Sequence, residues 1–168
     1  MTDVFSKAKR SEVMARIRSR GNKATELEFM KLLRRHHISG WRRHLAITLP
    51  KSKGATSRSR CPRVRPDFVF PKSKVAIFVD GCFWHGCPIH CAPPSSNSDF
   101  WSEKLAINKK RDLNVNRRLR RKHWSVFRFW EHQLNDGARL ESRLRTKLKS
   151  RNALKCDVRR TFPASIEL

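Results

Sequence analysis

The chain has 168 residues, of which 39 are lysine or arginine and 14 are aspartate or glutamate, so its formal net charge is +25. This length fits one domain with one modest core, and a charge this large attracts polyanions and favours nucleic acid as the partner. No long apolar span and no secretory signal are present, so we expect neither membrane attachment nor export, and five cysteines in such a chain favour a metal site over disulfides.

The N-terminal part is predicted to contain a basic arm followed by a helix. Residues 1–21 are strongly basic, with Met14 among their few large apolar side chains, and we expect this arm to gain order on a partner. Asn22 is placed to cap a helix over residues 23–37. Glu26 shares the apolar face of that helix, which leaves two interpretations: a helix-margin residue that reaches solvent, or a carboxylate that points into a functional cleft.

The middle of the chain is predicted to be rich in strands. Trp41–Thr48 has the pattern of a strand, and residues 50–62 form a flexible loop with scarcely any apolar content. Two further strands follow over residues 66–70 and 74–79. The second contains an unbroken apolar run, which is typical of a strand that is covered on both faces.

The C-terminal part is predicted to contain a long helix, a strand and a basic amphipathic helix. The long helix begins at Ser98 or Asp99 and ends near Lys122, the strand covers residues 124–130, and the last helix covers residues 138–150. The tail from 151 to 168 has no clear assignment. This order of elements predicts a single-domain α/β fold in which helices flank a mixed central sheet.

A short segment after the apolar strand carries the ligands that zinc prefers. Cys82, Cys87 and His90 follow Asp80-Gly81 with a spacing close to that of tetrahedral zinc sites. His132, which follows the last strand, is the natural fourth ligand, and Cys91 is the alternative. The sequence therefore predicts a structural zinc site.

Two carboxylates are placed where a catalytic metal ion would need them. Asp67 opens one core strand and Asp80 ends the next, so both meet at one end of the sheet if the strands are neighbours. Such a pair suits Mg²⁺ and phosphodiester hydrolysis, whereas the alternative is that both residues only form turns. His85 lies on the same loop and is available for proton transfer, unless it is a zinc ligand or a satisfied loop histidine.

The long helix has an unusual inner stripe, with polar side chains in the middle of an apolar face. Its members are Trp101, Leu105, Asn108, Asp112, Val115 and Leu119. A buried polar network is one explanation, and contact of the first half of the helix with nucleic acid through Trp101, Lys104 and Asn108 is the other. Phe83, Trp84 and Trp101 are aromatics of the kind that insert between base pairs.

The motifs together resemble one known family, the very short patch repair (Vsr) mismatch endonucleases. The resemblance is carried by the run from Val75 to His90, and by Lys9-Arg-Ser, Arg65-Pro-Asp-Phe, Phe100-Trp-Ser-Glu-Lys104 and Trp130-Glu131, all in the family's order. It implies a fold similar to that of type II restriction endonucleases. It also implies nicking of one strand next to the thymine of a T·G mispair, which arises when 5-methylcytosine deaminates.

The resemblance also assigns catalytic roles to individual residues. Asp67 takes the position of the magnesium-binding aspartate, His85 that of the histidine near the scissile phosphate, and Glu26 that of an acidic residue that positions water. Asp80 stands where the best-studied member has histidine, so it adds a carboxylate and a candidate Mg²⁺ ligand.

The remaining assignments concern zinc and DNA. The zinc positions fall on Cys82, Cys87, His90 and His132, the last of which replaces a cysteine of that member. The intercalating side chains correspond to Phe83, Trp84, Trp101 and Met14, and the mispair contacts to Lys104 and Asn108. Residues 51–64 stand as an inserted loop.

We therefore expect a Mg²⁺-dependent, zinc-stabilised mismatch nicking endonuclease with a basic arm (1–21), an endonuclease domain (22–150) and a tail (151–168). Its expected partners are duplex DNA with a T·G mispair and a MutL-type mismatch-repair protein, and it is expected to be a monomer at the nucleoid in the bacterial cytoplasm. The alternatives are a non-catalytic zinc-stabilised nucleic-acid-binding module and a restriction or homing nuclease that cuts paired DNA.

Overall fold

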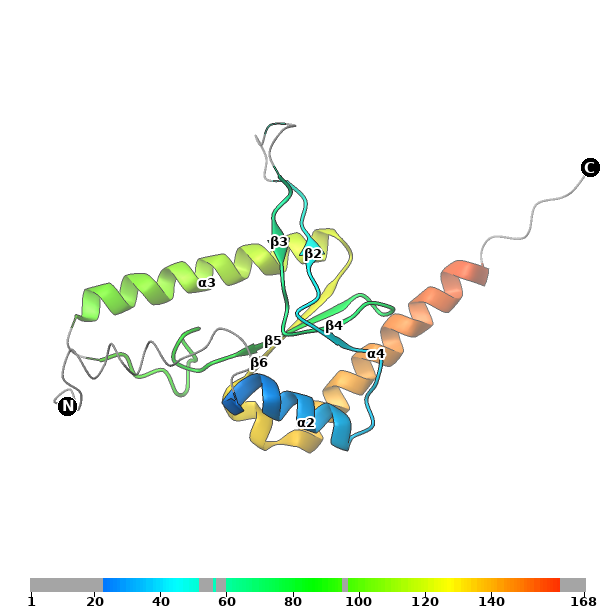
Figure 1. Cartoon of the computed structure of the whole chain (residues 1–168), viewed down its shortest axis with the longest axis horizontal. Helices are drawn as coiled ribbons and strands as arrows, with labels where there is room; N and C mark the ends of the chain where they lie inside the picture. The colour runs from blue at the N-terminus through cyan, green and yellow to red at the C-terminus, as the bar shows by residue number, and fades with distance from the viewer. Residues whose placement is uncertain (1–22, 52–55, 57–59, 95–96, 161–168) are drawn as a thin grey trace, which may run out of the picture.

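The computed structural model describes residues 23–51, 56, 60–94 and 97–160 (Figure 1). Within these residues, four strands form a mixed sheet in the order β1-β4-β5-β6. The strands are β1 (Arg42–Arg43), β4 (Phe68–Phe70), β5 (Val75–Asp80) and β6 (Ser125–Trp130). The first two pairings are antiparallel and the pairing of β5 with β6 is parallel, so the predicted mixed sheet is confirmed.

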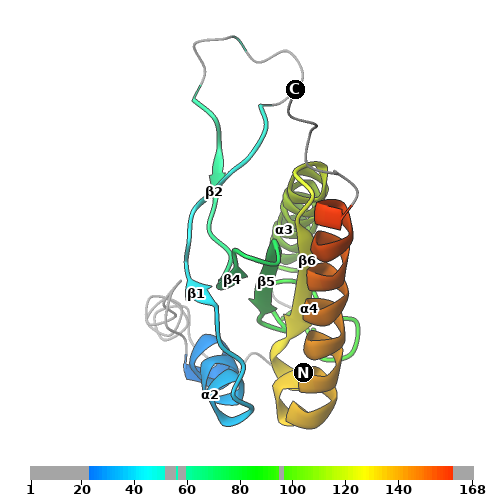
Figure 2. The ribbon, with the colours of Figure 1, turned by 90° about the vertical axis from the view of Figure 1, so that its right-hand side faces the viewer.

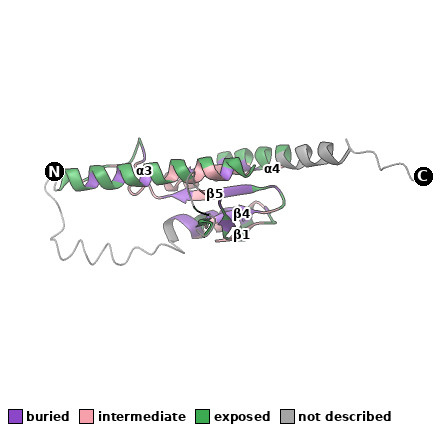
Figure 3. Ribbon diagram, turned by 90° about the horizontal axis from the view of Figure 1, so that it is seen from above, coloured by how far each residue is buried: buried purple, intermediate pink, exposed green. Residues whose placement is uncertain are grey.

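Helices cover both faces of this sheet, as the sequence predicts. The helical elements are the π-helical turn η1 (Lys23–Leu27), α2 (Glu28–Arg35), α3 (Ser98–Arg121), the 3-10 turn η2 (Glu131–Asn135) and α4 (Gly137–Arg160). One core cluster joins α2 and α4 to the sheet, and a second joins α3 to the opposite face. Figure 3 shows β5 as largely buried and α3 as largely exposed, with a few buried positions along it.

The alternation of side chains along β5 explains the two cores. Val75, Ile77 and Val79 pack into the cluster with α2 and α4, whereas Ala76 and Phe78 pack into the cluster with α3. Five of the six residues of β5 are buried, as expected for a strand covered on both faces. The predicted stripe on α3 is also confirmed, since its buried residues are Trp101, Leu105, Asn108 and Leu119.

The predicted strand over Trp41–Thr48 is wrong, because the chain divides there between two sheets. Arg42–Arg43 pair with β4, whereas Ile47–Thr48 form β2 and pair with β3 (Arg63–Val64). His44, between them, has φ 51°, a left-handed conformation that an extended strand does not allow. The resulting β2–β3 arm extends away from the main sheet (Figure 2), so the segment predicted as a loop before Arg65 contains a strand.

Other boundaries differ from the prediction as well. The last helix continues to Arg160, past its predicted end at residue 150. The predicted cap Asn22, the basic arm and Met14 lie outside the described residues. Among the residues that the structure describes, no helix has the length and apolar character needed to cross a bilayer.

Candidate active site

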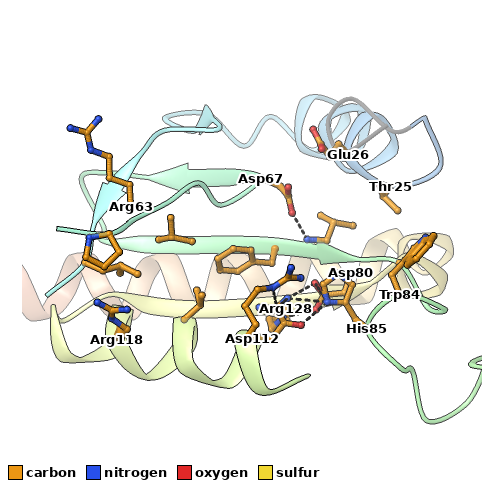
Figure 4. A pocket seen from close by; sticks show the side chains of 18 residues that line it. Thr25, Glu26, Arg63, Asp67, Asp80, Trp84, His85, Asp112, Arg118 and Arg128 are labelled. Carbon is orange, nitrogen blue, oxygen red and sulfur yellow. Dashed lines mark hydrogen bonds and ion pairs between the residues drawn. The ribbon is translucent and has the colours of Figure 1, made fainter. Parts of the chain in front are cut away.

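A groove of about 650 Å³ lies between the β2–β3 arm and α3, with β5 along its floor (Figure 4). Its walls carry the cations Arg63, Arg111 and Arg118. Figure 4 shows Arg63 and Arg118 toward one end and the acidic residues toward the other. A basic groove with a local acidic centre can hold a phosphate backbone and place a divalent cation against it.

Asp67 and Asp80 meet at one end of the sheet, as their positions on neighbouring strands predict. Phe68 pairs with Ile77, so the start of β4 lies beside the end of β5, and both carboxylates line the groove. The Val79 N–H donates to Asp67 Oδ2 at 2.8 Å. Burial raises the pKa of Asp67 to about 6, against this hydrogen bond and with help from the charges of Glu26 and Asp80. Ionisation of Asp67 therefore destabilises the folded chain.

Glu26 is buried at the same end of the groove and lines it, so its side chain does not reach solvent at the helix margin. Only 5% of its side chain is exposed, and it contacts Arg43 at 2.6 Å and His44 at 3.0 Å. Ligand atoms of Glu26, His44 and Asp67 all lie within 4.8 Å of one another. The structure therefore groups Asp67 with Glu26 and His44 as a set of candidate cation ligands, and Asp80 is not in this set.

Asp80 is instead held by an arginine from the neighbouring strand. Arg128 of β6 donates to both oxygens of Asp80 at 2.6 Å, and its guanidinium also reaches Asp112 at 3.1 Å. Asp80 is 4% exposed, and such a bidentate contact neutralises its charge within the protein. Asp80 is therefore less available to a metal ion than Asp67.

His85 is oriented by an acidic residue of α3. Its Nδ1 lies 2.6 Å from Asp112 Oδ2, whereas the nearest Asp80 oxygen is 3.7 Å away. Burial acts to raise the pKa of Asp112, but the hydrogen bond from His85 and the charge of Arg128 outweigh it, so this pKa is lowered. An anionic Asp112 that accepts from Nδ1–H leaves Nε2 of a neutral His85 as the free nitrogen for proton transfer.

The four predicted zinc ligands come together where the loop after β5 meets η2. Ligand atoms of Cys82, Cys87, His90 and His132 all lie within 4.8 Å of one another. Cys82 Sγ is 3.1 Å from His132 Nδ1, and Cys87 Sγ is 3.8 Å from the same nitrogen. Cys91 Sγ donates to the Phe83 carbonyl instead, which favours His90 over Cys91 as the ligand.

This donor set fits zinc. In a tetrahedral zinc site, bonds of about 2.3 Å to sulfur and about 2.0 Å to nitrogen place sulfur and nitrogen about 3.5 Å apart. The sulfur–nitrogen distances here lie on both sides of that value. Two thiolates and two imidazoles form a closed structural set that could bind zinc, and this set ties the loop to the end of β6.

The loop also presents an aromatic cluster to α3. The Phe83 ring lies 5.2 Å from Trp84 and 5.1 Å from Trp101, both edge to face, and the two tryptophans are 6.3 Å apart. Trp101 is 7% exposed and forms the base of the cluster, whereas Phe83 and Trp84 are partly exposed above it. In this structure the rings of the loop are therefore the accessible ones.

The two predicted mispair-contact residues have different surroundings. Lys104 is exposed on α3, so its ammonium is free to reach a ligand. Asn108 is buried, and its Nδ2 donates to the Trp84 carbonyl at 2.9 Å. Asn108 thus ties the aromatic loop to α3, which agrees with a buried polar role for this member of the stripe.

Sequence reasoning missed Arg43, His44, Asp112 and Arg128 as site residues. Asp112 had a signal, because it was a carboxylate on the inner stripe of a helix. Arg128 had a weaker one, since it interrupts an apolar strand with a charge. Arg43 and His44 had none, because the backbone turn that brings them to Glu26 was not predicted.

Comparison with known proteins gives consistent matches. Residues 51–92 match the sequence profile of the family described as DNA mismatch endonuclease Vsr. The chain is 36% identical over 150 residues to the type II nicking enzyme V.XorIIP of Xanthomonas oryzae pv. oryzae, a match that covers 88% of this chain and 98% of that enzyme. It is 51% identical over 71 residues to the type II nicking enzyme V.NaeI of Lentzea aerocolonigenes, covering 42% of this chain and 43% of that enzyme. It is 38% identical over 79 residues to the DNA mismatch endonuclease Vsr of Escherichia coli, covering 45% and 49%. The matches to V.NaeI and to the E. coli protein thus span less than half of each relative.

Proposed function

Because the chain belongs to the Vsr DNA mismatch endonuclease family, we propose that it nicks one strand of duplex DNA beside the thymine of a T·G mispair. Two of the relatives are nicking enzymes and one is a mismatch endonuclease by name, which supports both parts of the proposal. The family also implies the restriction-endonuclease-like fold that the sequence suggested, in agreement with the mixed sheet flanked by helices.

One observation carries the proposal most directly: a single basic groove contains a buried carboxylate pair and a histidine with an acidic partner. Glu26 and Asp67 lie on one side of the acidic centre, and His85 with Asp112 on the other. A non-catalytic binding surface has no need of buried carboxylates, since they repel phosphate. Hydrolysis of a phosphodiester can use both groups, the carboxylates to bind a metal ion and the histidine to accept a proton.

In this proposal, Asp67 and Glu26 would hold the catalytic Mg²⁺, in place of the water-positioning role that the resemblance gives Glu26, and the ion would supply positive charge at the scissile phosphate. The Val79 N–H donates to Asp67 Oδ2 and orients this carboxylate in the groove. Asp80 was predicted as a second ligand, but both of its oxygens accept from Arg128. We therefore propose that Asp80 positions Arg128, which in turn forms an ion pair with Asp112.

His85 is the proposed proton acceptor. Asp112 holds its Nδ1, and Nε2 takes a proton from the attacking water while the water oxygen bonds to phosphorus; the bond to the leaving oxygen breaks, its electron pair stays on that oxygen, and the oxygen takes a proton from solvent. The low pKa of Asp112 keeps it anionic and able to stabilise the imidazolium that forms. The zinc cluster fixes the loop that carries His85, so we assign it a structural role.

Recognition is assigned to the aromatic loop and to α3. We assign insertion at the mispair to Phe83 and Trp84, which lie against Trp101, and the resemblance gives Met14 of the N-terminal arm the same role. Lys104 is proposed to contact the bases or backbone there, and Asn108 keeps the loop in place. A mispair lowers the cost of unstacking at its own site, so an aromatic wedge gains most there.

The test uses duplexes that differ only in one pair, T·G against T·A, with each strand labelled separately and Mg²⁺ present. The proposal predicts a nick in the thymine strand of the T·G duplex alone. Cleavage of both strands of the T·A duplex would identify a nuclease of the restriction or homing type. A mobility shift without any nick would identify a non-catalytic binding module.

Two further parts of the proposal concern the cellular setting. One mispair is asymmetric, which suits a monomer rather than a symmetric dimer. We propose that the nick is formed in the bacterial cytoplasm and passed to other repair proteins, with a MutL-type protein as the partner.

A further inference from the structure

We propose that His44 completes the catalytic cation site as a nitrogen ligand beside Glu26 and Asp67, so that the site prefers a transition cation such as Mn²⁺ over Mg²⁺. The inference deepens the proposed function and rests on it for the location of the ion. It concerns a residue to which neither the motifs nor the comparisons assign a role.

The distances fit shared coordination by Glu26 and His44. His44 Nε2 lies 3.0 Å from Glu26 Oε2. Adjacent ligands of an octahedral ion with bonds of about 2.1 Å are separated by about 3.0 Å. The nearest Asp67 oxygen completes a set in which no two ligand atoms are more than 4.8 Å apart, so small rotations of the side chains close it around an ion.

The backbone directs His44 to this place. His44 stands where the chain leaves the main sheet for the β2–β3 arm, and its N–H donates to the Asp67 carbonyl at 3.3 Å. The imidazole and the Asp67 carboxylate are therefore carried by segments that are bonded to each other. The His44 side chain is 22% exposed, so the site is shielded enough for side chains to coordinate an ion directly and open enough for the ion to enter.

A cation already occupies part of this space. Arg43 Nη2 lies 2.6 Å from Glu26 Oε2 and 3.4 Å from His44 Nε2, so it contacts two of the three candidate ligand atoms. Among the described residues, Arg43 Nε is the one buried side-chain polar atom without a hydrogen-bond partner. The guanidinium is thus incompletely satisfied here and stands in for the charge of a metal ion, which would displace it toward solvent.

The identity of the ligands decides the identity of the ion. Mg²⁺ prefers oxygen ligands, whereas imidazole suits first-row transition cations, and Mn²⁺ accepts both carboxylate and imidazole. A site with two carboxylates alone would bind Mg²⁺ and Mn²⁺ with a small difference. The addition of His44 should widen that difference.

The experiment uses the full chain with zinc bound, so that Mn²⁺ does not fill the cysteine cluster. Pulsed electron paramagnetic resonance of bound Mn²⁺ reports nitrogen-14 coupling directly, and titrations give the Kd of Mn²⁺ and, by competition, of Mg²⁺. His44→Asn is the test variant, because asparagine tolerates a left-handed backbone. His37→Asn is the matched control, since His37 also has φ 51° but is exposed. Circular dichroism checks that each variant is folded.

We expect nitrogen coupling in the wild type and in His37→Asn, and its loss in His44→Asn. In His44→Asn the Kd of Mn²⁺ should rise by about tenfold or more, while that of Mg²⁺ changes by less than about threefold. Arg43→Gln should shift the affinity in the opposite direction, since it removes the competing cation. Coupling that persists in His44→Asn, or is absent from the wild type, would overturn the inference.

The same preparations separate this inference from the proposed function. Mg²⁺-supported nicking of the T·G duplex without nitrogen coupling leaves the function standing and removes His44 from the site. Nitrogen coupling without nicking in the presence of either Mg²⁺ or Mn²⁺ would keep His44 as a ligand and contradict the proposed nicking function.

Discussion

The Asp67→Asn variant tests two properties of this carboxylate separately: the stability that is lost by burying its charge, and its contribution to nicking. Asparagine has nearly the same shape, and its Oδ1 can accept the Val79 N–H in place of Asp67 Oδ2, so the substitution removes the charge and little else. Burial raises the pKa of Asp67 from the ordinary 3.8 to about 6. We therefore expect the variant to lose nicking and, without Mg²⁺, to gain stability.

The sign follows from the raised pKa. Because the folded state binds this proton more tightly than the unfolded chain, the contribution of Asp67 to stability is present below pH 3.8 and lost as the pH rises through about 6. About two pKa units correspond to about 3 kcal/mol, which is an upper figure for the gain of the variant at pH 8. Partial solvent access lowers the expected gain to about 1–3 kcal/mol. Between pH 8 and pH 5 the gain should fall by about 1 kcal/mol.

The assay is urea unfolding at pH 5 and pH 8 in magnesium-free buffer without a strong chelator, so that zinc is retained. Asp99→Asn, at an exposed carboxylate in the first turn of α3, is the matched control and should change little at either pH. Added Mg²⁺ should stabilise the wild type and leave Asp67→Asn unchanged, since only the wild type binds it. A variant less stable than the wild type at pH 8 without Mg²⁺ would refute the reasoning, because Asp67 would then be a structural anion.

Three further predictions test the other groups. His85→Ala should lower the single-turnover nicking rate by about 10²–10⁴ while mispair binding stays measurable; an unchanged rate removes His85 from proton transfer. Cys91→Ser should keep about one zinc per chain by metal analysis, whereas His90→Ala should lose zinc and stability; the opposite result reverses the ligand assignment. Trp84→Ala should reduce the difference in affinity between T·G and T·A duplexes without changing the slope of log affinity against log salt concentration. Arg63→Ala should instead lower the affinity for both duplexes and reduce that slope by about one unit. Equal loss on both duplexes in the tryptophan variant would make Trp84 a packing residue.

Much of the fold could be predicted from local sequence patterns. The apolar run of β5 needed cover on both faces, and the long polar–apolar stripe of α3 could only be an amphipathic helix on the sheet. The zinc ligands were also predictable, because three of the four lie within nine residues of chain and their chemistry is specific. In each case the information lies in neighbouring residues.

The parts that failed depend on contacts between distant residues. The strand over Trp41–Thr48 had an acceptable pattern, but its halves pair with different partners, and no local signal marks the turn at His44. The partner of Asp80 was equally hidden, since Arg128 lies 48 residues further along and reaches it only because β5 and β6 are parallel neighbours. A carboxylate that looks like a metal ligand in the sequence acquires another role when a guanidinium is placed beside it.

The contrast between Asp67 and Asp80 explains why one end of one sheet can hold both a metal site and a proton-transfer site. Arg128 sits opposite Phe78 in the register of β5 and β6, and its guanidinium contacts Asp80 and Asp112, while Arg111 lies 3.8 Å from Asp112, so two cations face two carboxylates on that side. On the other side, Arg43 of the neighbouring strand β1 pairs with Glu26, and among the described residues Asp67 has no ion pair with an arginine, so two carboxylates face one cation. Negative charge is therefore compensated around His85, where a histidine must remain neutral to accept a proton. It is left in excess around Asp67, where an added cation can relieve it.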